Sequence, residues 1–156
     1  MHLIDSHCRS HKHVTRSTFS AETLAAVAAV DFLIPIAITL HEVVMGPLSA
    51  SESRRMREEG GLCFKQTLTI DAMSLFAAVA ASTVKVPSER SLACHLFWLR
   101  ELIDRQVINR LVWADTRDMT ADCHTKGSVD RQAILALMLG NFKFQHPVKI
   151  FPEPNP

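Results

Sequence analysis

The sequence lacks a CxxC pair, an excess of charge of one sign and a secretory signal, and each absence excludes a class of protein. Its four cysteines are spread along the chain, which indicates reduced thiols inside a cell and not a disulfide framework. Lysine and arginine number 17 against 16 acidic residues, so any contact with nucleic acid must come from local patches. The amino terminus, MHLIDSHCRS, has no basic-then-apolar pattern, so we expect an intracellular protein, cytoplasmic or nuclear.

The length and the hydrophobic content predict one domain. A chain of 156 residues, 47% of them hydrophobic, can bury one core but hardly two. We place the domain at residues 1–146 and a proline-rich tail at residues 147–156, whose end, FPEPNP at residues 151–156, is expected to be loose. The apolar stretch at residues 24–40 contains Asp31 and Pro35, so we expect a buried helix and no membrane partner.

The spacing of apolar residues predicts an alternation of helices and strands. Ser20 is expected to cap a long helix over residues 21–44, bent at Pro35. Further helices are predicted at residues 72–81, 88–105 (capped by Ser88) and 130–139, and a helical turn at 120–125. Strands are predicted at 63–70 and 108–114, and an exposed strand or strand pair at 3–16. Residues 46–61 are expected to form a solvated connection with at most one helical turn. This alternation predicts an α/β fold in which helices cover a sheet.

Three carboxylates occupy positions that suit a metal site. Glu22 lies in the first turn expected of the long helix, Asp71 at the carboxyl end of a strand, and Asp122 beside a short helix after the next strand. Ligand sites of open α/β sheets gather at strand carboxyl ends, so Asp71 is the strongest single candidate. Converging carboxylates would bind Mg²⁺, which prefers oxygen ligands. A structural explanation stays open, because glutamates complement helix dipoles, aspartates cap turns, and Asp115 and Asp118 are equally plausible neighbours.

Three phrases of the sequence resemble the ribonuclease H domain of copia-type retrotransposon polyproteins. Residues 14–24, VTRSTFSAETL, resemble its "SS-x-AEAE" region, where a strand runs into the first helix. Residues 69–74, TIDAMS, resemble its strand-end "D-x-x-S", and residues 113–127, WADTRDMTADCHTKG, resemble its closing "W-x-x-T-x-x-x-x-AD-x-x-TK-G". The phrases occur in the right order and span nearly the whole chain.

The resemblance implies a fold, a reaction and a set of site residues. It implies a ribonuclease H-like α/β fold with a mixed sheet and flanking helices, and metal-dependent hydrolysis of the RNA strand of an RNA–DNA hybrid. Glu22, Asp71 and Asp122 match the catalytic, metal-binding carboxylates, with Mg²⁺ or Mn²⁺ as cofactor. An upstream reverse transcriptase segment of the same polyprotein is the expected partner.

The sequence departs from the family at its start. The family begins with a strand that carries an aspartate in a "D-x-D-x-x-G"-like phrase and continues with a second strand. This sequence matches only the elements after those two strands, and the context of Asp5 is different. We therefore expect a domain truncated at its amino end, with the first strands missing and with weak or no activity alone. The alternative is a non-catalytic retroelement relic or a protein-interaction module.

Other groups of residues give weaker indications of a functional site. A soft-ligand cluster of His2, His7, Cys8, His11 and His13, together with the pairs Cys94-His95 and Cys123-His124, would suit zinc, but no standard finger spacing accompanies it. No G-x-S-x-G phrase indicates a serine hydrolase. The basic run at residues 54–57 is balanced by neighbouring glutamates and indicates a solvated surface, and Trp98 and Trp113 are expected in the core.

Overall fold

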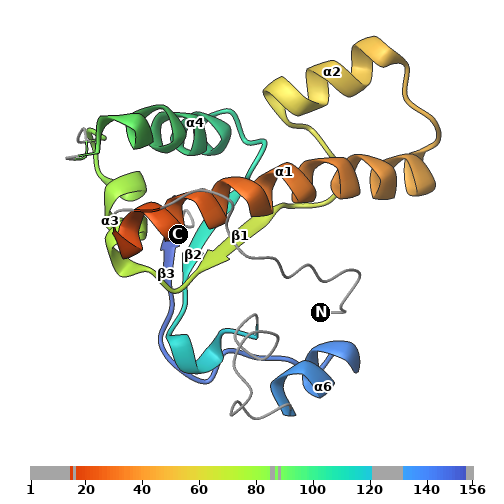
Figure 1. Cartoon of the computed structure of the whole chain (residues 1–156). Helices are drawn as coiled ribbons and strands as arrows, with labels where there is room; N and C mark the ends of the chain where they lie inside the picture. The colour runs from red at the N-terminus through yellow and green to blue at the C-terminus, as the bar shows by residue number, and fades with distance from the viewer. Residues whose placement is uncertain (1–14, 16, 85–86, 88, 121–131, 154–156) are drawn as a thin grey trace.

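Helix α1 (Thr18–Met45) is the longest element and crosses most of the width of the molecule in Figure 1. The computed structural model describes residues 15, 17–84, 87, 89–120 and 132–153. The helix is predicted correctly, but its start lies earlier than expected. Ser17 is the N-cap, and its hydroxyl oxygen accepts a hydrogen bond from the backbone amide of Ser20 at 3.1 Å. The helix continues through Pro35, whose carbonyl accepts a hydrogen bond from the Thr39 hydroxyl at 3.0 Å.

The sheet has three strands in the order β1-β2-β3. Strands β1 (Thr67–Ile70) and β2 (Arg110–Trp113) are parallel, and β3 (Lys149–Phe151) is antiparallel to β2. The chain is therefore an α/β protein with a mixed sheet, as predicted. Both predicted strands are shorter than expected. Residues 63 and 64 bend before β1, and the Gln66 backbone amide donates to the Asn109 side chain. Before β2, the Ile108 amide donates to the Leu102 carbonyl of α4.

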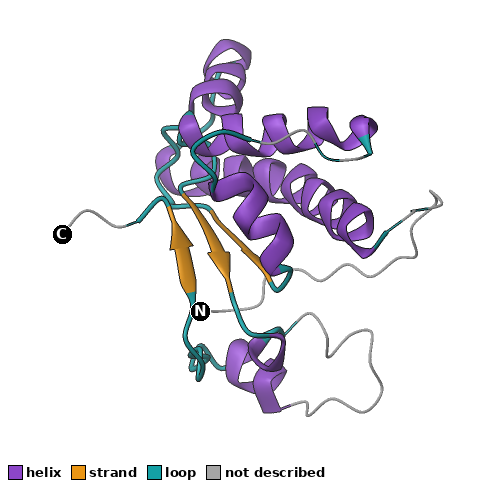
Figure 2. Ribbon diagram, turned by 90° about the vertical axis from the view of Figure 1, so that its left-hand side faces the viewer, coloured by secondary structure: helices purple, strands orange, loops and turns teal. Residues whose placement is uncertain are grey.

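The helices that form the core lie together on one side of the sheet (Figure 2). Helix α3 (Met73–Ala80) follows β1 directly, as predicted, and packs against α1 and α4. The helix predicted at 88–105 is a 3-10 turn, η1 (Arg90–Leu92), followed by α4 (Ala93–Asp104), and its expected cap Ser88 lies outside the described residues. The buried cluster contains Ala26, Val30, Leu68, Ile70, Leu75, Phe76, Val79, Leu96, Leu99, Leu102, Ile103, Val107, Ile108 and Leu111. Trp98 and Trp113 pack against this cluster, which confirms their predicted place.

The charged stretch after α1 forms a helix that was not predicted. Helix α2 (Ala50–Glu59) begins with a capping box, in which the Ser49 hydroxyl accepts from the Glu52 amide and the Glu52 carboxylate accepts from the Ser49 amide. None of its residues is buried, so the prediction of a solvated basic run holds. Gly60 ends α2 with φ +75°, and a side chain there would collide with the backbone of Gln106.

The carboxy-terminal residues leave the helical layer and then return to the sheet. After β2 come the 3-10 turn η2 (Thr116–Asp118) and helix α6 (Gln132–Met138), which lies away from the other helices in Figure 1. The predicted helix at 130–139, closed by Gly140, is thus confirmed over the described part. The predicted tail contributes β3, because Ile150 and its neighbours pair with β2; of the segment expected to be loose, Phe151 belongs to this strand. The predicted strands at 3–16 and the turn at 120–125 lie outside the described residues except at their edges.

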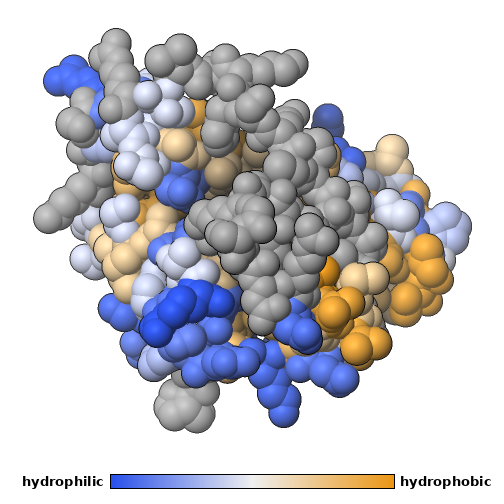
Figure 3. Space-filling model, turned by 60° about the horizontal axis from the view of Figure 1, so that its bottom comes forward, coloured by the Kyte–Doolittle hydropathy of each residue, from blue (hydrophilic) through white to orange (hydrophobic). Residues whose placement is uncertain are grey.

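Exposed large apolar side chains gather in groups of three at two places. Val43, Val44 and Met45 end α1, and Leu135, Met138 and Leu139 lie on or beside α6. Figure 3 shows that hydrophobic surface gathers on one side of the face it presents. Helix α1 is long and apolar enough to cross a membrane by length and composition alone, a test that core helices of soluble proteins also pass. Its amino-terminal half belongs to the core, as Val30 at 0% exposure shows.

Candidate functional site

The strongest predicted site residue, Asp71, lies where the parallel strands end. Ile70 is level with Trp113 in the ladder, and the backbone amide of Ala114 donates to the Ile70 carbonyl at 2.9 Å. The indole Nε1 of Trp113 donates to the backbone carbonyl of Asp71 at 2.8 Å. Asp71 and Asp115 thus follow two neighbouring parallel strands at the same edge of the sheet, where ligand sites of α/β folds form.

Glu22 lies one turn farther into its helix than the sequence predicted. Since α1 begins at Thr18, the first turn holds no acidic residue, and the expectation of a first-turn glutamate was wrong. Glu22 is half-buried. Helix α1, which carries Glu22, packs against β1, the strand that Asp71 follows, so the two predicted carboxylates come from elements in contact.

The described residues do not assemble the predicted metal site. Asp122, the third predicted ligand, lies outside them. Within the described part of the chain, no group of three His, Cys, Asp or Glu side chains is arranged to hold a metal ion. The structure therefore shows where Asp71 and Glu22 lie but not the three carboxylates as one group.

The candidate zinc ligands are only partly described. The cluster between His2 and His13 and the pair Cys123-His124 lie outside the described residues. Cys94 is a free, exposed thiol on α4, and His95 beside it is half-buried. Sequence reasoning did not single out His41, which is buried on α1 and whose Nδ1 accepts a hydrogen bond from the Cys63 backbone amide at 3.0 Å. That bond joins α1 to the segment before β1, so His41 has a structural role.

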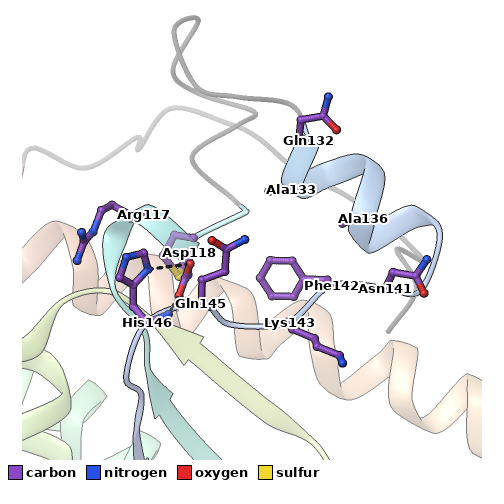
Figure 4. A pocket seen from close by; sticks show the side chains of 11 residues that line it. Arg117, Asp118, Gln132, Ala133, Ala136, Asn141, Phe142, Lys143, Gln145 and His146 are labelled. Atoms are coloured by element: carbon purple, nitrogen blue, oxygen red, sulfur yellow. Dashed lines mark hydrogen bonds and ion pairs between the residues drawn. The ribbon is translucent and has the colours of Figure 1, made fainter.

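A second polar centre, which the sequence did not predict as a site, forms around Asp118. This carboxylate is only 7% exposed and belongs to the turn η2. Its Oδ2 accepts hydrogen bonds from the backbone amides of Gln145 at 3.0 Å and His146 at 2.8 Å. Its Oδ1 lies 3.1 Å from Nδ1 of His146 (Figure 4). The signal in the sequence is weak, since Asp118 stands out only as a neighbour of Asp122, while His146 lies 28 residues away.

Hydrogen bonding keeps Asp118 ionised. Burial alone would raise the pKa of its carboxyl group, but the hydrogen bonds from the backbone and the ring of His146 and from the backbone of Gln145 lower it below its ordinary value. Nearby, hydrogen bonds from the Arg117 side chain and backbone hold the pKa of Asp115 well below its usual range, and the same pairing raises the pKa of Arg117. Both carboxylates are therefore charged at neutral pH.

A cavity of about 550 Å³ opens beside this centre. It lies between η2, α6 and the segment 141–146, and Figure 4 shows the side chains that line it. The lining residues are Arg117, Asp118, Met119, Gln132, Ala133, Ala136, Asn141, Phe142, Lys143, Gln145 and His146. Both polar and apolar side chains line this cavity.

Comparison of the chain with protein-family models, with curated proteins and with solved structures gave no match.

Proposed function

We propose that the chain is part of a ribonuclease H-like nuclease derived from a copia-type retrotransposon, with weak or no activity by itself. The observation that supports this most directly is the position of Asp71 at the carboxyl end of β1. This strand is parallel to its neighbour β2, and helices α3 and α4 connect the two. The element order of a long helix, a strand, helices and a parallel strand agrees with the order of the three resembling phrases. The substrate in intact relatives would be an RNA–DNA hybrid, in which the 2′-hydroxyl and the groove shape distinguish RNA from DNA.

The residues proposed for the chemistry are Glu22, Asp71 and Asp122. Their carboxylate oxygens are the donors that Mg²⁺ or Mn²⁺ prefers. When bound, the metal would activate a water molecule for attack and stabilise the negative charge that develops on the leaving oxygen. The backbone of Asp71 is anchored, since its carbonyl accepts a hydrogen bond from the Trp113 indole at 2.8 Å.

The nuclease proposal is tested by cleavage of a labelled RNA–DNA hybrid during a titration with Mg²⁺ or Mn²⁺. We expect any cleavage by the purified chain to require the metal and to disappear in Asp71→Asn, because the amide has lost the charge that attracts the metal. The matched control is Asp31→Asn, an exposed aspartate on α1, which should leave cleavage unchanged. Equal cleavage by wild type and Asp71→Asn would attribute the activity to a contaminant.

A second candidate is a non-catalytic relic or interaction module. It is favoured by a departure of the sequence from the family, since no phrase of it matches the family's aspartate-bearing "D-x-D-x-x-G". A folded chain that does not cleave the hybrid at any metal concentration would support it. Translation of the genomic DNA around the coding sequence tests the retroelement origin by itself. A neighbouring reverse transcriptase would support that origin whether or not the chain cleaves the hybrid.

A further inference from the structure

Strand β1 lies at an edge of the sheet and has a hydrogen-bonding neighbour, β2, on one side only (Figure 1). The Ala114 amide donates to the Ile70 carbonyl at 2.9 Å, so the even-numbered residues of β1 are the ones that bond to β2. The backbone amides and carbonyls of Thr67 and Thr69 therefore point away from β2. Within the described part of the chain, no hydrogen bond reaches these outward groups.

The outer edge of β1 is open to pairing with another strand. Its sequence, TLTI, contains no proline, and Thr67 is exposed. The opposite edge of the sheet differs, because β3 lies between Pro147 and Pro152, and a proline has no amide hydrogen to donate. Of the two edges, β1 is therefore the one that can add a strand from another chain.

Two side chains of opposite charge flank β1. Lys65 is exposed two residues before the strand, and the half-buried Asp71 follows its last residue. Among the described residues, neither side chain makes an ion pair. In an extended chain the odd-numbered residues share one face, so Lys65 and Asp71 lie at the two ends of the face that also carries Thr67 and Thr69. A strand that pairs here should carry the complementary charges in reverse order.

The β1 edge is complementary to itself. Two copies related by a two-fold axis pair as antiparallel strands. With the axis at Leu68, Thr67 lies opposite Thr69 of the second copy, and the two residues exchange both of their outward hydrogen bonds. The same register places Lys65 opposite Asp71 of the second copy, so an ion pair forms at each end of the paired strands. A register centred on either threonine would place Lys65 opposite an uncharged residue.

We propose that the chain forms a symmetric homodimer in which the β1 strands of two copies pair antiparallel about Leu68 and join the two sheets into one. Backbone hydrogen bonds supply the affinity, and the ion pairs between Lys65 and Asp71 set the register. The dimer needs no metal ion, so it does not rest on the nuclease proposal, and Asp71 would be open to a metal ion in the monomer alone. The interface is small, which implies a dissociation constant on the order of 0.1 mM.

The test is sedimentation equilibrium of the full chain at concentrations from about 10 µM to about 1 mM, over which wild type should change from monomer to dimer. Lys65→Glu and Asp71→Lys should each weaken self-association at least about tenfold, because each places like charges opposite one another at both ends of the paired strands. The matched control is Lys149→Glu, at an exposed lysine of the other edge strand, which should dimerise like wild type.

An equimolar mixture of Lys65→Glu and Asp71→Lys gives the sharpest result. In a mixed dimer the introduced glutamate faces the introduced lysine, and the unchanged Asp71 of one chain faces the unchanged Lys65 of the other. The mixture should therefore dimerise about as tightly as wild type, although each variant alone does not.

Thr67→Pro tests the backbone hydrogen bonds separately from the charges. The Thr67 amide is not used within the sheet, so proline is compatible with this edge position and removes a donor that serves the second copy. The variant should dimerise about tenfold more weakly, whereas Thr67→Val keeps the amide and should dimerise like wild type. Circular dichroism checks that each variant is folded.

Three outcomes would overturn the homodimer. One is a wild-type chain that stays monomeric up to about 1 mM. Another is a charge-reversed variant, Lys65→Glu or Asp71→Lys, that dimerises like wild type. The third is a mixture of these two variants that associates no more tightly than either variant alone.

Discussion

The helical core and the carboxy-terminal lobe, defined as residues 115–120 and 132–148, are held together by different forces. In the core, Val30, Leu96 and Ile108 are fully buried at 0% exposure. In the lobe, helix α6 has no buried residue, and Leu135 and Leu139 are 49% and 70% exposed. The lobe relies on one buried carboxylate, Asp118, which bonds the turn η2 to residues 145 and 146.

The contrast shows how stability is distributed in the molecule. Burial of a large aliphatic side chain contributes about 1.5–3 kcal/mol, and the core contains many of them. A hydrogen bond to a charged group contributes about as much, but among the described residues of the lobe Asp118 is the one buried carboxylate that accepts from a distant segment. The core should therefore tolerate changes in pH, whereas the lobe should depend on the ionisation of one residue.

The largest expected effect is the loss of a core side chain. Leu96→Ala should lower the free energy of unfolding by about 3 kcal/mol, because Leu96 is completely buried and its removal leaves a cavity. Urea unfolding measured by circular dichroism gives this value. Leu135→Ala, the same change on half-exposed α6, should cost less than about 0.5 kcal/mol. Similar losses for the two variants would contradict the difference between core and lobe.

A smaller effect is expected from the lobe. Asp118→Ala should lower the free energy of unfolding by about 2 kcal/mol at neutral pH, since it leaves two backbone amides without an acceptor. Hydrogen exchange should rise first at Gln145 and His146. The control is Asp104→Ala, which removes an exposed aspartate paired with Arg100 and should cost less than about 0.5 kcal/mol. Unchanged exchange at residues 145 and 146 would show that Asp118 does not hold the lobe.

The difference in free energy of unfolding between wild type and Asp118→Ala should also shrink as the pH falls. The folded-state pKa of Asp118 lies below the ordinary value of 3.8 because hydrogen bonds outweigh the opposing effect of burial. Its carboxylate therefore contributes stability above about pH 4, and this contribution is lost as the pH falls through the folded-state pKa. The stabilities of the two proteins should converge between about pH 5 and pH 2. A constant difference over that range would mean that the charge is unimportant.

The smallest effect is expected outside both regions, at the solvated helix α2. Ser49→Ala removes the hydroxyl that accepts from the Glu52 amide and should destabilise α2 by about 1 kcal/mol. Because none of the residues of α2 is buried, the loss should appear as faster hydrogen exchange within α2 and hardly in global unfolding. Ser82→Ala, at an exposed serine in a bend, is the control. A full loss in global stability would mean that α2 folds as one unit with the core.

The sequence by itself determined the elements whose signals are local. The spacing of Leu24, Val27, Val30, Ile34 and Ile38 predicts α1, and the β-favouring run that ends at Ile70 predicts β1 and the place of Asp71 after it. Helix α2 was missed because its residues have no apolar stripe, although Ser49 and Glu52 carry the spacing of a capping box. Glu22, Asp71 and Asp122 as one metal site stay a prediction, since Asp122 lies outside the described residues.

Only the tertiary structure decided what distant segments do together. Strand β3 has three residues next to prolines and becomes a strand because β2 offers it a free edge. Asp118 and His146 meet across 28 residues, and neither has a neighbour in sequence that indicates the other. Periodicity and capping depend on residues within a few positions of one another, whereas a buried carboxylate takes its donors from wherever the folded chain returns.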